Sequence, residues 1–201
     1  MTKRCDVVAR RDELRAAILA AADARVAATG LRDLGVREIA HEAGCSSGMV
    51  YKLFASHDEL VLAVNANTLQ ALSDEVTERL RGIDDPANAL CAMADAYLDY
   101  AAANTARWDT LFAHRQSGGA MLPGWYAEVR DRLFDGIGNT IGIAPPNART
   151  LFSAVHGVVA LGLAQKVGSV SLDMLRAELR ALMTAIAQGM AQRHALAAPR
   201  S

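Results

Sequence analysis

Apolar side chains recur along the chain at the three- and four-residue intervals of a helix, and strand-like alternation never extends over a useful length. In the first such stretch, Leu14, Ile18, Ala22 and Val26 share one helical face. Divided at its caps and breakers, the pattern predicts nine helices, at residues 12–29, 36–43, 47–54, 56–80, 86–104, 105–115, 125–141, 147–167 and 172–192. The sequence therefore predicts an all-α fold.

Two start signals organise these helices into domains. Ser56 and Glu59 have the spacing of a capping box, in which the serine caps the third amide and the glutamate reaches back. Asp85 and Pro86 form the first substantial break, with an N-cap followed by proline at the first helical position. The predicted division is an N-terminal domain at 1–56, a connecting helix at 57–82 and a C-terminal helical bundle at 83–201.

Composition narrows the function classes. The 40 alanines against five prolines favour helices further. The net charge is -1, and residues 1–60 alone hold nine basic and nine acidic side chains, so a nucleic-acid function must rest on local pattern. No secretory signal follows the basic N-terminus, and the longest uncharged run in the second half, residues 151–165, is too short for a membrane helix. We therefore expect a soluble, cytoplasmic protein.

The most informative stretch is residues 36–54, which predicts two short helices around a tight turn. A helix-turn-helix needs a small side chain midway along its first helix and, four residues on, a glycine at positive φ, and Ala40 and Gly44 have this spacing. The predicted core positions are Ile39, Ala43, Val50 and Phe54, and the outward positions are Ser46, Ser47, Gly48, Met49, Tyr51 and Lys52. Hydroxyls, a closely approaching backbone and a lysine suit phosphates and base edges, so this face predicts DNA binding. The alternative is a helical hairpin that carries a small residue and a glycine by chance.

The stretch from Leu14 to Leu60 resembles the DNA-binding domain of the tetracycline-repressor (TetR) family of bacterial regulators. The matching positions are 36–40, 43–44, 48–51, 54, 56 and 58–60. The resemblance implies a homodimer that binds double-stranded operator DNA and a small-molecule effector. It also implies roles for named residues: phosphate contacts for Tyr51 and Lys52, positions at the groove for Ser46, Ser47 and Gly48, and a flanking position for Arg37.

Three positions depart from the family pattern, and one of them is Ser47, where the family frequently has a basic residue. Gly35 stands where the family often has a capping threonine, and His57 stands where it often has a phosphate-binding lysine. Glycine caps less well than serine or threonine by only a few tenths of a kcal/mol. A histidine that is mostly neutral at pH 7 gives a weaker phosphate contact, so His57 is left out of the predicted DNA-binding set.

The segment 152–162 resembles the eighth-helix segment of a TetR C-terminal subfamily marked by the triplet Trp-His-Gly. Here Val155 stands in place of the tryptophan, and His156 and Gly157 follow it. The resemblance positions this helix within the C-terminal part.

The few aromatic side chains gather in the middle helices, where helical bundles hold ligands in their cores. The candidate effector-binding residues are Met93, Tyr97, Trp108, Phe112, Trp125, Tyr126, Phe152 and His156. Taken singly, each is more simply explained as ordinary core, and only as a set do they indicate a cavity. His156 is either a core histidine with a satisfied hydrogen bond or the polar group that orients a ligand. The set predicts an apolar or aromatic effector of modest size.

A dimer interface is predicted on the last two helices. On the eighth, a stripe of small residues would let another helix approach closely, and on the ninth a continuous apolar face exceeds what one surface helix needs. The predicted interface residues are Ser153, Gly157, Ala160, Ala164, Leu175, Leu179, Leu182 and Ile186. The alternative is that both faces pack only within one chain.

Enzyme chemistry is not supported. Gly44-Cys45-Ser46-Ser47-Gly48 fits the G-x-S-x-G pattern of a hydrolase nucleophile elbow, but that elbow needs a preceding strand. No two of the five histidines are spaced to bind a metal from one helix face, so we expect no metal, no cofactor and no catalytic residue. The sequence favours a ligand-responsive transcriptional regulator, with repression as the expected sign of regulation. The alternative is a helical sensor or scaffold that no longer binds DNA.

Overall fold

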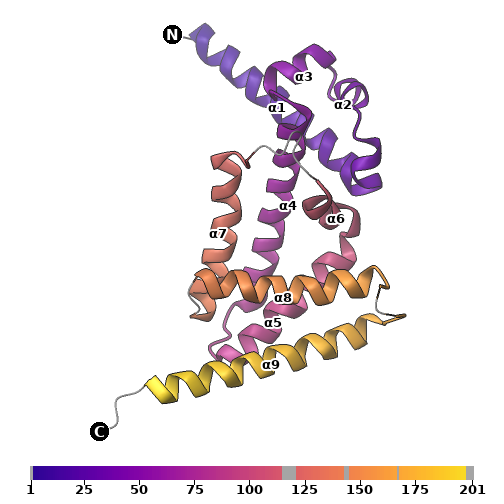
Figure 1. The fold of residues 1–201 in the computed structure, drawn as a ribbon. Coiled ribbons are helices and arrows are strands. Elements are labelled where there is room, and N and C mark those ends of the chain that lie inside the picture. Colours follow the sequence, from indigo (N-terminus) through magenta and orange to yellow (C-terminus); the bar gives the residue numbers. More distant parts are fainter. Residues whose placement is uncertain (1, 115–120, 143–144, 167, 198–201) are drawn as a thin grey trace. The chain divides into compact units, whose positions relative to one another are not determined.

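The computed structural model describes residues 2–114, 121–142, 145–166 and 168–197, and this part of the chain is built of helices (Figure 1). The elements are α1 Thr2–Thr29, the 3-10 helix η1 Gly30–Asp33, α2 Val36–Glu42, α3 Ser47–Leu53, α4 His57–Leu80, α5 Pro86–Ala103, α6 Thr105–Ala113, α7 Gly124–Ile141, α8 Pro145–Leu163 and α9 Leu172–Ala197. The predicted all-α fold is confirmed. Within the described ranges, no helix combines the length and apolar character that crossing a membrane requires.

The chain forms two compact units, and the residues are divided between them differently from the predicted domains. The first unit comprises Met1–Leu69 and Asn104–Val129, and the second comprises Gln70–Ala103 and Arg130–Ser201. The predicted boundary at residues 82–86 does not coincide with this division. The reason is α6, which lies beyond that boundary but packs against α1 and η1 in the first unit, where its Arg107 donates a hydrogen bond to Asp23 of α1.

The core of the first unit contains the apolar stripe that the sequence predicts for α1. Ile18, Ala22 and Val26 are fully buried, and they pack with side chains from α2, α3 and the first half of α4. The other buried members of this cluster are Leu34, Ile39, Ala40, Val50, Phe54, Leu60, Val61, Ala63 and Val64. This packing holds the two short helices α2 and α3, which alone are too short to be stable.

Capping side chains set where α4 and α5 begin. The Glu59 amide donates to Ser56 Oγ at 3.0 Å, as the capping box predicts. The Glu59 carboxylate accepts from the Ala55 amide at 2.6 Å, one residue earlier than the box prescribes. At the next helix the Asn88 amide donates to Asp85 Oδ2 at 2.8 Å, so Asp85 caps α5 as predicted.

The second unit is built around α5, which packs against α8 and most extensively against α9. Figure 1 shows these three helices together, with α8 and α9 running side by side. Arginines of α9 extend to acidic side chains of α5: Arg180 Nη2 lies 2.6 Å from Asp95 Oδ2, and Arg176 Nη2 lies 2.6 Å from Asp99 Oδ1. Arg79 of α4 adds a contact of 3.2 Å to Asp99, so this ion-pair network joins three helices.

Several helix bounds differ from the predicted ones. α1 begins at Thr2 instead of residue 12, so it extends well beyond the apolar stripe from which its start was inferred. α8 begins at Pro145, because proline needs no amide partner in the first turn of a helix. It ends at Leu163 instead of residue 167, and Gln165 beyond it takes a positive φ of 53°. These differences move helix ends and leave the predicted order of helices unchanged.

Candidate DNA-binding and effector sites

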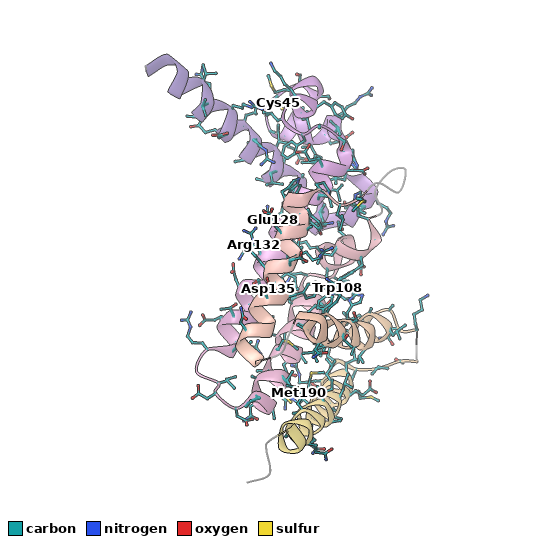
Figure 2. The ribbon with its side chains drawn as sticks, turned by 60° about the vertical axis from the view of Figure 1, so that its left-hand side comes forward. Cys45, Trp108, Glu128, Arg132, Asp135 and Met190 are labelled. Carbon is teal, nitrogen blue, oxygen red and sulfur yellow. The ribbon has the colours of Figure 1, made fainter. Side chains whose placement is uncertain are left out.

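α2 and α3 form a helix-turn-helix with the geometry that the residue spacing predicts. Gly44 has a φ of +67°, and the Cys45 amide donates to the Ala40 carbonyl at 2.8 Å across the turn. Ala40, Ile39 and Val50 are buried where the helices meet, so the small residue is needed at position 40. Figure 2 shows Cys45 at this turn, where it packs partly against the core as a free thiol.

The predicted DNA-binding residues lie on the side of this motif that the core does not use. Arg37, Gly48 and Lys52 are exposed, and Tyr51 exposes 53% of its surface although it is a large ring. Ser47 is partly buried at the start of α3. Because the neighbouring Val50 and Phe54 are almost wholly buried, the polar and apolar sides of α3 are sharply separated.

Ser46 has a structural task in addition to its predicted position at the groove. It is the N-cap of α3, and its hydroxyl oxygen accepts a hydrogen bond from the Met49 amide at 3.3 Å. The hydroxyl proton stays available to an outside acceptor. The residue before this turn belongs to helix α2 and not to a strand, so the G-x-S-x-G pattern here does not form a nucleophile elbow.

Two of the departures from the family pattern, at Gly35 and His57, have a local explanation. His57 Nε2 lies 3.0 Å from the Leu34 carbonyl, a bond that ties the start of α4 to the end of η1. A lysine there could not both reach a phosphate and keep this short contact. Gly35 is the N-cap of α2, and a Cβ at this position would overlap the carboxylate of Glu38. Sequence reasoning missed the His57 contact because it joins residues 23 positions apart in the chain.

Three acidic side chains of the first unit lie close to basic side chains of the same unit. Glu42 pairs with Arg25 at 2.6 Å, and Asp23 pairs with Arg107. Asp58 Oδ1 lies 3.5 Å from His114 Nε2, and burial lowers the pKa of this histidine more than Asp58 raises it.

The eight candidate effector residues fall into both units. In the first unit, Trp108 is buried and packs edge-to-face on Phe112 with 5.4 Å between ring centroids. Figure 2 shows Trp108 on α6. Phe112 itself is 43% exposed, and Trp125 is also exposed beside the buried Tyr126. These four residues form two ring pairs within this unit.

The other four candidates come together in the second unit. Tyr97 of α5 packs edge-to-face on Phe152 of α8 at 5.5 Å, and its hydroxyl lies 2.9 Å from His156 Nδ1. Phe152 stacks on His156 with an interplanar angle of 8°. Met93, Tyr97 and Phe152 also line a cavity of about 20 Å³ with Leu72 and Val155. Sequence reasoning missed those two residues, because Leu72 and Val155 look like plain core.

His156 supplies the polar character of this cluster. Burial lowers the pKa of its imidazole, so the ring is neutral at pH 7 and one of its nitrogens is an acceptor. Phe134 of α7 closes the cluster by packing on Phe152 at 5.3 Å. A cavity of about 20 Å³ has room for one water molecule, so an effector would need these rings to move apart.

The predicted dimer residues divide between free and buried surfaces. Ser153 and Ala164 are exposed, and a Cβ at Gly157 would meet no atom within 4 Å. The prediction is wrong for Leu175 and Leu179, which are buried inside the chain where α9 packs on α5 and α8. A Cβ at Gly162 of α8 would overlap the Leu175 side chain, which shows how closely these helices approach. Ala160, Leu182 and Ile186 are partly buried.

Comparison with known protein families assigns both the helix-turn-helix and the C-terminal helices to one family. The model for bacterial regulatory proteins of the tetR family matches residues 18–64, and the model for the tetracyclin repressor-like C-terminal domain matches residues 90–186. The chain belongs to the TetR family. Neither model describes a catalytic family. Members of the TetR family bind operator DNA and small-molecule ligands and act as dimers.

Individual relatives agree with this assignment. The chain is 29% identical over 168 residues to the HTH-type transcriptional regulator Rv1816 of Mycobacterium tuberculosis, which covers 81% of this chain and 65% of the relative. It is 29% identical over 160 residues to the HTH-type transcriptional activator FasR of Mycolicibacterium smegmatis, covering 76% and 70%. The chain thus spans slightly less than two thirds of the length of some curated relatives that it matches.

The TetR fold also appears among solved structures. A TetR transcriptional regulator from Rhodococcus sp. RHA1 superposes with a TM-score of 0.66 at 17% sequence identity, covering 89% of this chain and 97% of that one. The TetR N-terminal match begins at Ile18 of α1 and ends at Val64 of α4, so it includes α2, α3 and every predicted DNA-binding residue. Residues 1–17 lie outside both family matches.

Proposed function

We propose that this TetR family protein is a transcriptional regulator that binds a pseudo-palindromic DNA operator through α2 and α3 and is released by a small molecule. One observation carries the proposal: the motif buries its central apolar residues, Ile39, Ala40, Val50 and Phe54, and leaves Arg37, Gly48, Tyr51 and Lys52 exposed. An exposed tyrosine and lysine on a short helix beside a glycine are suited to phosphates and to close approach of the backbone.

A binding assay with defined variants tests the DNA function. DNA that the wild-type protein enriches from a random-sequence pool provides the duplex. Replacing Lys52 or Tyr51 with alanine removes one predicted phosphate contact, so each variant should bind more weakly and lower the salt slope by about 0.9. Arg81→Ala is a control, because Arg81 pairs with Glu78 on an exposed surface of the second unit. Unchanged affinity in both folded variants would contradict the assignment of this face.

The effector site that we propose lies at the cluster of Tyr97, Phe152 and His156. The rings supply apolar surface, and the hydrogen bond between Tyr97 and neutral His156 supplies one donor and one acceptor to a ligand. We infer a small aromatic effector that carries a hydroxyl group.

Matched ligands test this site. 2-Naphthol should raise the melting temperature of the protein more than naphthalene does, because only naphthol can hydrogen-bond to the Tyr97 and His156 pair. In Tyr97→Phe the apolar contacts remain, so the two compounds should become equivalent. Equal shifts from both compounds in the wild-type protein would mean that the pair does not contact the ligand.

We propose that the protein represses transcription while it is bound to its operator and that release by the effector ends this repression. The relative FasR is named an activator, so the sign is best measured directly with a reporter gene placed behind the selected DNA. Expression that rises on deletion of the protein supports repression.

A scaffold or sensor without DNA binding is the second candidate, since residues 1–60 carry no net charge. The exposure of Arg37, Tyr51 and Lys52 on the helix-turn-helix argues against it. A protein that enriches no sequence from the random pool while remaining folded would support the scaffold instead.

A further inference from the structure

The first helix is longer than its domain requires. α1 has 28 residues, but its fully buried side chains begin only at Ile18. Between residues 7 and 17 only Leu14 is partly buried against the core, and the others are exposed, including Val7 at 68% and Val8 at 54%. Both figures show the first turns of α1 extending past the part of the helix that packs with α2 and α3 (Figures 1 and 2). We call residues 7–15 the N-terminal arm.

The charges of the arm are sorted by face. Arg11 precedes the buried Ile18 by seven positions, which places the two about 20° apart around the helix. Arg15 also lies on this side. Asp12 and Glu13 are rotated from Arg11 by about 100° and 200°. The side of α1 that carries Ile18 in the core thus carries Arg11 and Arg15 in the N-terminal arm.

A contact fixes which way this basic face is directed. The Arg15 guanidinium carbon lies 4.5 Å from the centre of the Phe54 ring, a cation–π contact. Phe54 directly follows α3, the helix that carries Tyr51 and Lys52. The basic face of the arm is therefore on the side of the first unit where α3 ends, and Arg11 stands one helical turn, about 6 Å, further out.

We propose that the N-terminal arm binds the phosphate backbone of double-stranded DNA next to the site contacted by α3, with Arg11 as its principal contact. This inference rests on the proposed DNA function and adds a second contact surface to it. Arg11 is exposed, and no carboxylate among the described residues forms an ion pair with it. A guanidinium matches phosphate oxygens in geometry and charge.

Two duplexes of different length test the arm. Both contain the sequence that the wild-type full chain selects from a random pool, and one adds ten base pairs on each side. On the long duplex Arg11→Gln should bind more weakly and lower the salt slope by about 0.9 for each lost contact. On the short duplex, which contains only the selected sequence, the affinity and the salt slope of Arg11→Gln should equal those of the wild-type protein.

Arg10→Gln is the matched control, since it removes the same charge from an exposed neighbour about 100° around the helix. Equal losses from Arg10→Gln and Arg11→Gln would overturn the proposal in favour of a diffuse charge effect, and so would an unchanged slope in Arg11→Gln. A change in sedimentation of Arg11→Gln without DNA would overturn it in favour of contact between two copies. If the wild-type protein selects no DNA, the proposed function is wrong. If it selects DNA but Arg11→Gln binds this DNA like the wild-type protein, only the proposed role of the arm is wrong.

Discussion

Two glycines at the helix-turn-helix have different physical reasons to be glycine. Gly44 takes a φ of +67°, and a Cβ there would meet no atom within 4 Å, so only backbone strain opposes a side chain. Gly48 lies inside α3 without a positive φ, where a Cβ would come no closer than 3.9 Å to Ser46 Oγ. The fold therefore explains Gly44 and leaves Gly48 unexplained.

Alanine at each position separates stability from binding. Gly44→Ala should destabilise the protein by about 1–2 kcal/mol through the left-handed backbone. Gly48→Ala should stabilise α3 by up to about 1 kcal/mol, since alanine is the better helix former. It should nonetheless weaken DNA binding, because its methyl group keeps the backbone from approaching DNA. Urea unfolding and operator binding measure the two effects. Undiminished binding by Gly48→Ala would show that α3 does not approach DNA at this residue.

At the scale of helices, the ion-pair network between α5 and α9 makes the second unit sensitive to acid. Burial alone would raise the pKa of Asp99, but hydrogen bonds and charge from Arg176 and Arg79 outweigh it and lower this pKa. Asp99 therefore stabilises the folded state above the unfolded pKa near 3.8, and this stabilisation is lost as the pH falls through the lower folded value. Asp95 is buried in the same network and contacts both Arg176 and Arg180.

Removing Arg176 should shift acid unfolding. In Arg176→Met the pKa of Asp99 returns toward its ordinary value, so the midpoint of acid unfolding should move to higher pH. Arg81→Met is the comparison, because Arg81 and Glu78 form an exposed pair within one helix that contributes little to stability. Circular dichroism followed from pH 7 to pH 2 measures both midpoints. Identical midpoints for the two variants would show that the network does not stabilise the unit.

Local signals in the sequence predicted the helices well. The features that the sequence did not predict depend on contacts between residues far apart in the chain. Gly44 and Asp85 could be assigned from spacing because turns and caps depend on a few adjacent residues. The place of α6 could not, since it depends on Arg107 meeting Asp23 far away in the chain. Likewise, the apolar face of α9 predicted that Leu175 and Leu179 are buried but did not show which surface covers them. Both were assigned to the interface with a second chain, although they pack within their own chain.

For the whole molecule, the relevant surface is the one that joins two copies, because TetR family proteins act as dimers. After Leu175 and Leu179 are removed from consideration, an uncovered stripe remains on α8, with Ser153, Gly157 and Ala164. On α9 the uncovered apolar residues include Met174, which is 54% exposed. A two-fold dimer built on both helices would bury this surface in a four-helix bundle.

A phenylalanine at Gly157 tests this dimer without disturbing the single chain. Because a Cβ at position 157 would meet no atom within 4 Å, Gly157→Phe should fold normally, yet it should overpack a seam at that residue and do so twice by symmetry. Gly162→Ala is the contrasting variant, since its methyl group would overlap Leu175 and should lower the melting temperature of the chain itself. Sedimentation equilibrium should find Gly157→Phe monomeric and operator binding weakened. A dimer as tight as wild type would mean that the two copies meet on another surface.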